Sequence, residues 1–213
     1  MFPDLTRDDV FRLETRRLWL RWPRQADAAA IVALAGEKVV ADMTGILPHP
    51  YPPGEAERFI FASRQANADG RRLTMAITPR SKPRDLIGIV NIRCDVATAP
   101  CLGYWLGTPH WSRGFATEAA RSLVDAFFAY TAGKELTASV RVINPASRRV
   151  LEKCGFGATG SGLESFPARG GLLPVDHFRL DRRKWESLKT WSASDYVPSL
   201  AEQPLDVLAL AAL

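Results

Sequence analysis

Residues 104–118 (YWLGTPHWSRGFATE) constrain the fold of this 213-residue chain most strongly. A strand-like segment ends at Gly-Thr-Pro, and a basic turn that contains Gly114 leads into an amphipathic helix. Backbone N–H groups converge at the start of a helix, where the helix dipole favours an anion. Gly114 can adopt a positive φ or approach a ligand closely, and the forked guanidinium of Arg113 suits a phosphate. The turn predicts a diphosphate-binding loop, although a plain strand-to-helix connection explains the turn alone equally well.

The helix that follows the turn carries a wide apolar stripe with three- and four-residue spacing, which predicts a firmly packed helix. The stripe consists of Ala116, Ala119, Ala120, Leu123, Val124, Phe127 and Phe128. Gly133 is a stop signal beyond its end. The Gly-x-Gly-x-x-Gly fingerprint and the Gly-Lys-Ser/Thr loop are both absent from the sequence, which argues against a dinucleotide-binding or nucleoside-triphosphate-binding loop.

Composition favours one ordinary globular domain. The chain is 46% hydrophobic and 24% charged, which argues against disorder, and we expect a single domain over 1–189. Residues 190–213 form an apolar tail, expected to dock on this domain or on a partner subunit. A net charge of +5 suits an anionic ligand. Direct nucleic-acid binding is not expected, because the basic residues form only scattered doublets, interpreted as solvated faces: Arg16-Arg17, Arg71-Arg72, Arg148-Arg149 and Arg182-Arg183.

The cysteines and histidines predict neither disulfides nor a metal site. The cysteines Cys94, Cys101 and Cys154 lack metal-ligand spacing, and the chain has only three histidines. The first residues have no apolar signal core, and the longest apolar run, 205–213, is too short to cross a membrane. We expect a cytoplasmic protein with no membrane contact.

Hydrophobic periodicity predicts alternating helices and strands. Strands are expected over 17–22, 73–78, 86–92, 102–106, 136–143 and 175–180, with a mixed, glycine-rich stretch from 156. Helices are expected over 25–35, 55–67 and 145–154, in addition to the long helix above, and a closing helical turn over 181–188. The proline-rich loop 44–54, which contains His49 and Tyr51, is interpreted as a lid. Consecutive strands beside helical connections predict an α/β fold with a mixed sheet.

Four segments in order resemble the GNAT superfamily of acyl-CoA N-acyltransferases, and in particular the branch of bacterial ribosomal-protein N-terminal acetyltransferases. They are residues 13–21 (LETRRLWLR), 102–106 (LGYWL), 111–119 (WSRGFATEA) and 144–156 (NPASRRVLEKCGF). The resemblance runs from about Thr15 to about Trp185. It implies about seven mostly antiparallel strands with about four flanking helices, and a splay between the fourth and fifth strands, here Leu102–Leu106 and Leu136–Ile143.

The resemblance also implies acetyl-CoA as co-substrate, with its pantetheine arm in the splay and no metal. The pantetheine would pair with main chain at Trp105, Leu106 and Gly107. The diphosphate would lie on the loop formed by Trp111, Ser112, Arg113, Gly114, Phe115, Ala116 and Thr117. Asn144 and Ser147 would face the cofactor; Asn144 is also a helix cap.

The reaction implied is direct attack of an amine on the acetyl thioester within a ternary complex. A main-chain N–H near Leu106 would stabilise the carbonyl oxygen. Ser147 is the candidate proton donor to the sulfur, since Leu151 stands where many relatives have a tyrosine. Cys101 stands where many relatives have a glutamate base. Glu164 is the candidate base instead, because the resemblance implies that the strand after the helix over 145–154 borders the acceptor cleft. His49 is a further candidate base, and Asp176 and His177 rank behind it.

Three functions follow, in order of preference. The first is an N-acetyltransferase acting on a protein N-terminal amine or a small-molecule amine, as a monomer or homodimer. The second is a catalytically weak protein that binds or senses acyl-CoA, which the missing tyrosine and glutamate favour. The third is a basic protein associated with nucleic acid, which would require steeply salt-dependent binding.

Overall fold

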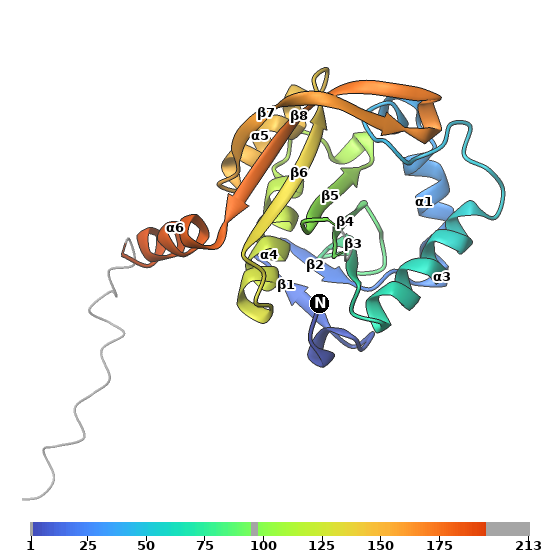
Figure 1. Cartoon of the computed structure of the whole chain (residues 1–213). Coiled ribbons are helices and arrows are strands. Elements are labelled where there is room, and N and C mark those ends of the chain that lie inside the picture. Colours follow the sequence, from blue (N-terminus) through green and yellow to red (C-terminus); the bar gives the residue numbers. More distant parts are fainter. Residues whose placement is uncertain (1, 95–97, 195–213) are drawn as a thin grey trace, which may run out of the picture.

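The computed structural model describes residues 2–94 and 98–194, and in this part of the chain one mixed sheet contains eight strands (Figure 1). Their spatial order is β1-β2-β3-β4-β5-β6-β8-β7. Every neighbouring pair is antiparallel except β5 and β6. The strands are β1 (Arg12–Glu14), β2 (Leu18–Arg21), β3 (Arg72–Pro79), β4 (Gly88–Arg93), β5 (Cys101–Leu106), β6 (Glu135–Arg141), β7 (Gly157–Phe166) and β8 (Gly171–Asp181).

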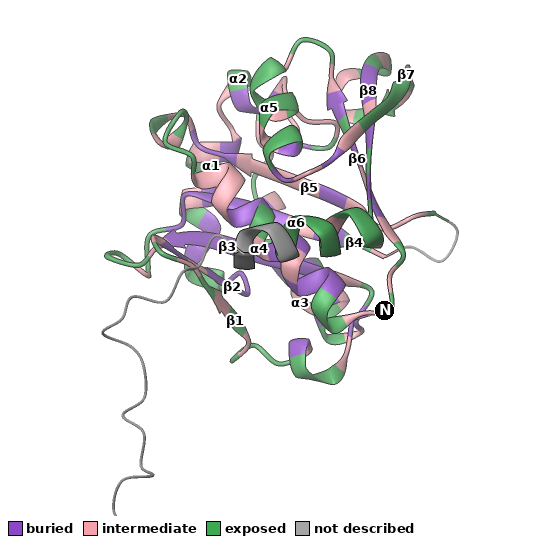
Figure 2. Cartoon of the chain, turned by 90° about the vertical axis from the view of Figure 1, so that its left-hand side faces the viewer, coloured by how far each residue is buried: buried purple, intermediate pink, exposed green. Residues whose placement is uncertain are grey.

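Helices cover both faces of the first half of the sheet. The α-helices are α1 (Ala28–Ala35), α2 (Lys38–Ala41), α3 (Glu55–Ala68), α4 (Phe115–Tyr130), α5 (Pro145–Lys153) and α6 (Arg182–Ser194). Short 3-10 helices span Asp4–Thr6, Gln25–Asp27, Thr108–His110 and Pro167–Arg169. The apolar stripe of α4 packs on one face with Leu20 and Met75, whereas α1 and α3 pack on the other with Ala76 and Ile89. Figure 2 shows these buried layers.

The second half of the sheet is covered on one face only. Along β6, Leu136, Ala138 and Val140 are buried in the core beneath α4 and α5. The alternate residues Thr137 and Ser139 lie opposite Arg179 and His177 of β8, so these side chains share the other face. We call this polar face of β6, β8 and β7, which looks toward the viewer in Figure 1, the open face.

The expected splay is present between β5 and β6. These parallel strands pair only at Cys101 and Thr137, where the Thr137 N–H donates to the Pro100 carbonyl (2.8 Å). On the opposite edge of β5, the Gly107 N–H donates to the Ile87 carbonyl (3.0 Å). Main-chain groups of alternate residues point to the same neighbouring strand. The main-chain groups of Tyr104 and Leu106 therefore point away from β4. They face the gap that opens between β5 and β6 beyond the pairing at Cys101.

Most of the expected elements are confirmed within a few residues, and three differences have a clear cause. β1 was not predicted, because its three residues bury no side chain completely. The glycine-rich stretch from 157 forms one long strand. Its pairing with β8 shifts register between Ala158 and Gly160, as at a β-bulge, so the strand continues past a glycine that favours strands poorly. The closing turn extends into α6, which crosses position 189; the tail from 195 to 213 lies outside the described residues.

The arginine doublets are not simply solvated, and that interpretation is wrong for Arg17, Arg148 and Arg182. Arg182 donates to the carbonyls of Phe128 (2.8 Å), Thr131 (2.7 Å) and Gly133 (3.0 Å), and so caps the end of α4. The other two hold elements of the site together. Among the described residues, none of the helices has the length and apolarity that crossing a membrane requires.

Candidate active site

The turn before α4 has the backbone of an anion-binding loop. Ser112 has a φ of 59° and Gly114 a φ of 77°, both in the left-handed region, and such bends point successive amides into one concavity. Gly114 is the N-cap of α4. The first amides of a helix, here those of Phe115 to Thr117, have no acceptor within the helix. The loop therefore directs N–H groups and the positive end of the helix dipole outward.

An ion-pair network from the start of β2 holds this loop. The Glu118 carboxylate accepts from Thr15 Oγ1 (2.6 Å), from the Arg17 N–H (2.8 Å) and from Arg17 Nε (2.7 Å). Arg17 also donates to the Arg113 carbonyl (3.0 Å), and its guanidinium lies 4.7 Å from the ring centre of Phe115. Partial burial opposes ionisation of Glu118, but these donors prevail and lower its pKa. Arg17 is thus a brace for the loop.

Trp111 ties the loop to the end of β5. Its Nε1 donates to the Leu106 carbonyl at 2.7 Å. The remaining main-chain group of Leu106, its N–H, points into the gap, because alternate residues of β5 bond to β4. Of the three residues expected along the gap, Leu106 is thus the one whose main chain borders it. The Gly107 N–H bonds to β4, and Trp105 packs against the core formed with α1 and α3.

A hydroxyl pair lies across the gap, between β5 and α5. Asn144 caps α5 by accepting from the Ser147 N–H (3.0 Å), as the sequence predicts. Tyr104 Oη donates to the Ser147 carbonyl (3.1 Å) and lies 2.8 Å from Ser147 Oγ. Burial raises the pKa of Tyr104 far above its usual value, so its phenol stays protonated. Leu151, at the position of the relatives' tyrosine, is fully buried in the core.

Sequence analysis did not single out Tyr104 as a candidate site residue. The residue lies within a quoted motif, but its role depends on which edge of β5 faces the gap. A polar aromatic residue between the buried residues Leu102 and Leu106 was the available signal.

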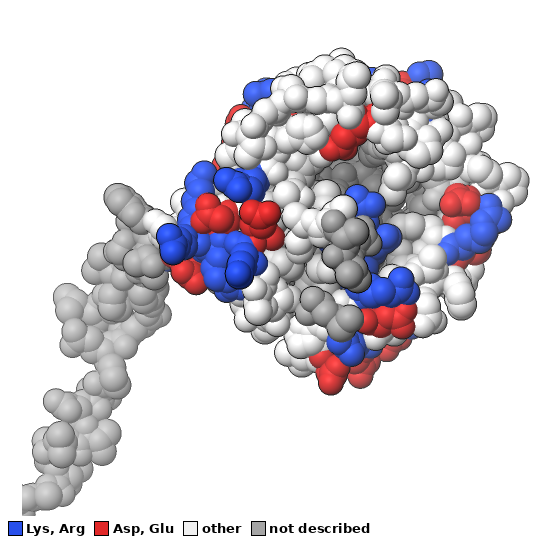
Figure 3. Space-filling model, in the orientation of Figure 1, with Lys and Arg blue, Asp and Glu red and all other residues white. Residues whose placement is uncertain are grey.

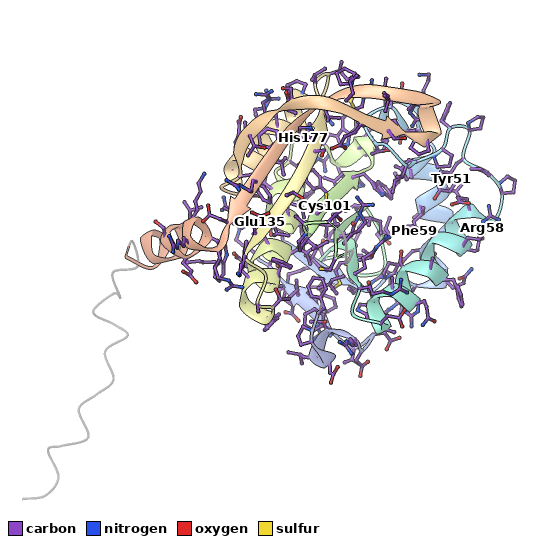
Figure 4. The ribbon with its side chains drawn as sticks, viewed as in Figure 1. Tyr51, Arg58, Phe59, Cys101, Glu135 and His177 are labelled. Carbon is purple, nitrogen blue, oxygen red and sulfur yellow. The ribbon has the colours of Figure 1, made fainter. Side chains whose placement is uncertain are left out.

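Glu164 belongs to a polar cluster on the open face, in a cavity of about 460 Å³. Ser139 Oγ donates to Glu164 Oε1 (2.6 Å), and His177 Nδ1 lies 3.3 Å from the same oxygen. Figure 4 shows His177 on β8, across the open face from Tyr51, Arg58 and Phe59 of the lid and α3. Figure 3 shows the surface hollowed beneath the β7–β8 hairpin. Sequence reasoning ranked His177 low and did not single out Ser139.

The other candidate bases are occupied elsewhere. His49 Nδ1 lies 2.9 Å from the Gly36 carbonyl, so this imidazole anchors the lid loop. Asp176 lies on the opposite face of the sheet from the Glu164 cluster, where it accepts from Ser161 Oγ (2.7 Å) and from Arg148 of α5. These two hydrogen bonds lower the pKa of Asp176. Cys101, half-buried at the pinch of the two strands, directs its thiol toward the Leu102 carbonyl (3.8 Å).

The lid contacts the tip of the β7–β8 hairpin. Arg169 donates to the Leu47 carbonyl (2.8 Å), and Arg141 of β6 lies 5.8 Å from the ring centre of Phe166. Burial, together with the nearby carboxylates of α3, raises the pKa of Tyr51 to about 12. The lid and the hairpin therefore form two walls of the hollow on the open face.

A groove of about 660 Å³ starts at the anion-binding loop and runs along α4. Gly114, Thr117 and Glu118 line its beginning, with Arg121 of α4 and Lys153 of α5 farther along. Within the described residues, no cluster of three His, Cys, Asp or Glu side chains could hold a metal ion.

Residues 17–157 match the acetyltransferase (GNAT) domain family. A curated relative, the uncharacterized N-acetyltransferase p20 of Bacillus licheniformis, is 33% identical over 84 residues, which are 39% of this chain and 47% of that protein. The match therefore spans about half the length of that relative.

Solved structures of similar fold include coenzyme complexes. RimJ of Mycobacterium smegmatis with CoA-disulfide has a TM-score of 0.71 and 20% identity, over 85% of this chain and 93% of that one. Spermidine N-acetyltransferase from Vibrio cholerae with CoA and spermine has a TM-score of 0.67 and 20% identity, over 81% and 99%. RimL, a ribosomal L7/L12 alpha-N-protein acetyltransferase with coenzyme A, has a TM-score of 0.70 and 16% identity, over 80% and 98%. The family match over residues 17–157, on a sheet that splays after β5, establishes that this chain belongs to the GNAT acetyltransferase family.

Proposed function

We propose that this protein is an N-acetyltransferase that moves the acetyl group of acetyl-CoA to a primary amine. One observation carries the proposal: the outward amides before α4 lie at the same end of β5 as the gap beside Leu106, and the Trp111 indole bonds the two together. Such a loop suits a diphosphate, and the gap suits an extended chain that pairs with main chain. The family match and the coenzyme complexes of the similar structures support the same choice.

The residues at the site fit coenzyme A. Amides from Ser112 to Thr117 would hold the diphosphate, with Arg113 as an exposed cation beside them. The φ of 77° at Gly114 is one that side-chain-bearing residues rarely adopt. The groove along α4 offers room for the nucleotide half. The Leu106 N–H would pair with the pantetheine arm, whereas Trp105 and Gly107, also expected there from the sequence, bond through their main chain to β4; Asn144 and Ser147 would face the arm from α5.

Two groups of this chain are placed to stabilise charge on the thioester. Acetyl-CoA supplies a carbonyl that gains negative charge when an amine attacks it, and a thiolate that leaves. The Leu106 N–H can donate to the carbonyl oxygen. Ser147 can donate to the sulfur when Tyr104 Oη, 2.8 Å away, turns its one proton from the Ser147 carbonyl to Ser147 Oγ and so orients that hydroxyl. Alignment of the two substrates supplies much of the remaining acceleration.

The Glu164 cluster is the proposed site for the amine. Its carboxylate lies on the open face, bonded to Ser139 of the strand that borders the gap. A carboxylate attracts the ammonium form of an amine, and a proton must leave before the nitrogen can attack. This cluster, with the Tyr104–Ser147 pair, favours catalysis over the alternative of an acyl-CoA sensor.

The acceptor is either a protein N-terminus or a small amine. By their names, similar structures include both kinds of enzyme: RimL, a protein alpha-N-acetyltransferase, and a spermidine N-acetyltransferase. The test is release of free thiol from acetyl-CoA in the presence of peptides with free alanine or serine N-termini, or of spermidine. We expect turnover with at least one of these amines. Tight acetyl-CoA binding by calorimetry with no turnover on any amine would instead identify a sensor.

A further inference from the structure

The Ser139–Glu164–His177 cluster has the connectivity of a carboxylate that orients an imidazole. Ser139 and His177 lie directly opposite each other on β6 and β8, and Glu164 reaches them from β7. Ser139 Oγ fixes Glu164 Oε1 at 2.6 Å, and His177 Nδ1 lies 3.3 Å from that oxygen. The side chains of Glu164 and His177 are 40% and 39% exposed, so solutes reach both.

This geometry determines which imidazole nitrogen can accept a proton. A carboxylate only accepts hydrogen bonds, so a neutral ring that donates to Glu164 from the facing nitrogen would carry its hydrogen on Nδ1. In the neutral ring, Nε2 is then the acceptor. Once Nε2 has taken a proton, the ring lies beside the carboxylate, as in other sites where a carboxylate orients a catalytic histidine.

Gly162 of β7 allows the ring to lie in this position. A Cβ atom placed on Gly162 would lie 2.9 Å from His177 Nε2, so any larger residue must displace the imidazole. By contrast, a Cβ on Gly171, at the start of β8 on the same hairpin, would meet nothing within 4 Å. The space at position 162 is therefore limited by the His177 imidazole and not by the backbone of the hairpin.

We propose that His177 Nε2 takes the proton from the acceptor's ammonium group, with Glu164 as the positioning carboxylate. This inference rests on the proposed N-acetyltransferase function and specifies its base. The ammonium group has three N–H bonds. One proton goes to His177 and then to solvent, the nitrogen lone pair forms the bond to the acetyl carbon, and the C–S bond breaks. The second proton ends on the sulfur through Ser147 and the third remains on the amide, so protons and electrons balance.

The pH dependence of the reaction tests the assignment. The other charged groups on the strands around the cluster are Glu135, Arg141, Asp176, Arg179 and Asp181. We compare kcat/KM for spermidine and for a serine-starting peptide between wild type, His177→Gln and Glu164→Gln from pH 6 to 10. General-base catalysis is worth about 10²–10⁴-fold, so we expect a loss of at least about 100-fold for His177→Gln at pH 7. The loss should shrink at high pH, where the free amine becomes abundant.

Glu164→Gln should lose less than His177→Gln, because the imidazole keeps its accepting nitrogen. Should His177→Gln retain the wild-type rate and pH profile while Glu164→Gln does not, the carboxylate itself is the base and the proposal is overturned.

Two alanine variants distinguish the effect of moving the imidazole from the effect of general damage to the β7–β8 hairpin. Gly162→Ala should reproduce the loss and the pH profile of His177→Gln, because the added methyl group displaces the ring. Gly171→Ala should behave as wild type. Equal activity of the two alanine variants would overturn the proposed ring position.

Histidine NMR tests the tautomer without any acceptor. The chain has three histidines, so the ¹⁵N-imidazole signals of His177 can be assigned with the His177→Gln variant. We expect the Nδ1–H tautomer in wild type and a change of tautomer population in Glu164→Gln. An Nε2–H tautomer in wild type would overturn the proposal. A wild type that acetylates no amine would overturn the proposed function and this inference together, whereas normal turnover with an unaffected His177→Gln would overturn this inference alone.

Discussion

Replacing Gly114 by valine tests whether main-chain amides before α4 bind the coenzyme. Gly114 is the N-cap of α4, and its φ of 77° lies in the left-handed region. A β-branched residue there must either accept this strain or turn the loop away. Its Cβ would lie 3.4 Å from Arg17 Nη2, an ordinary contact distance, so the strain comes from the backbone and not from a clash with the brace. Either response misdirects the amides that follow Gly114.

The expected loss can be estimated from the bonds at stake. Hydrogen bonds to charged groups contribute about 1.5–3 kcal/mol each. If two amides no longer donate to the diphosphate, the binding free energy of acetyl-CoA weakens by at least about 3 kcal/mol, which is about a hundredfold in Kd. The strain itself costs roughly 1–2 kcal/mol of stability, which lowers Tm by only a few degrees for a domain of this size.

Gly170→Val is the matched control. Gly170 has a φ of 74°, and a Cβ on it would meet nothing within 4 Å. It lies next to the 3-10 helix Pro167–Arg169, on the hairpin. Both variants should lose similar stability by thermal unfolding, but calorimetry should show weaker acetyl-CoA binding only for Gly114→Val. Unchanged affinity in Gly114→Val, or an equal loss in both variants, would refute the role of the loop.

Three further predictions concern the hydroxyl pair, the brace and the thiols. Ser147→Ala and Tyr104→Phe should each lower kcat about tenfold or more with little change in acetyl-CoA affinity, because each disturbs the donor to the leaving sulfur. Steady-state kinetics and calorimetry measure the two quantities. Equal losses of kcat and of affinity would mean that the two hydroxyl groups serve only to bind acetyl-CoA. Glu118→Gln should destabilise the protein at neutral pH. Since folding lowers the pKa of Glu118 from 4.5, its contribution is present above pH 4.5 and is lost as the pH falls through the lowered value, so the unfolding curves of wild type and variant should converge in acid; a difference that persists at low pH would contradict this. Burial raises the pKa of Cys154 to about 11, so a thiol reagent at pH 8 should leave it unmodified in the folded protein, and rapid labelling detected by mass spectrometry would contradict the packing.

Local signals predicted the turn before α4 and the helices α4 and α5. The turn at Gly114, the stripe on α4 and the Asn-Pro start of α5 are each formed by residues close to one another in the sequence, so helix periodicity and helix-start chemistry identify them. The long-range network behind them was not predictable. Glu118 accepts from Arg17, 101 positions away, and an arginine doublet in isolation resembles a solvated surface.

The cluster on the open face depends on strand register, which sequence patterns specify poorly. Ser139, Glu164 and His177 meet only because β6, β8 and β7 align in one particular way. A shift of one residue would move His177 to the other face, where Asp176 now lies. Tyr104 shows the same dependence, since its contact with Ser147 follows from the edge of β5 that faces the gap.

A crystal structure of the protein with coenzyme A would test the central claim most directly. We predict the diphosphate within hydrogen-bond distance of the amides between Ser112 and Thr117, and the pantetheine arm between β5 and β6 beside Leu106. A coenzyme bound elsewhere on the protein, with these amides turned toward protein acceptors, would contradict the account.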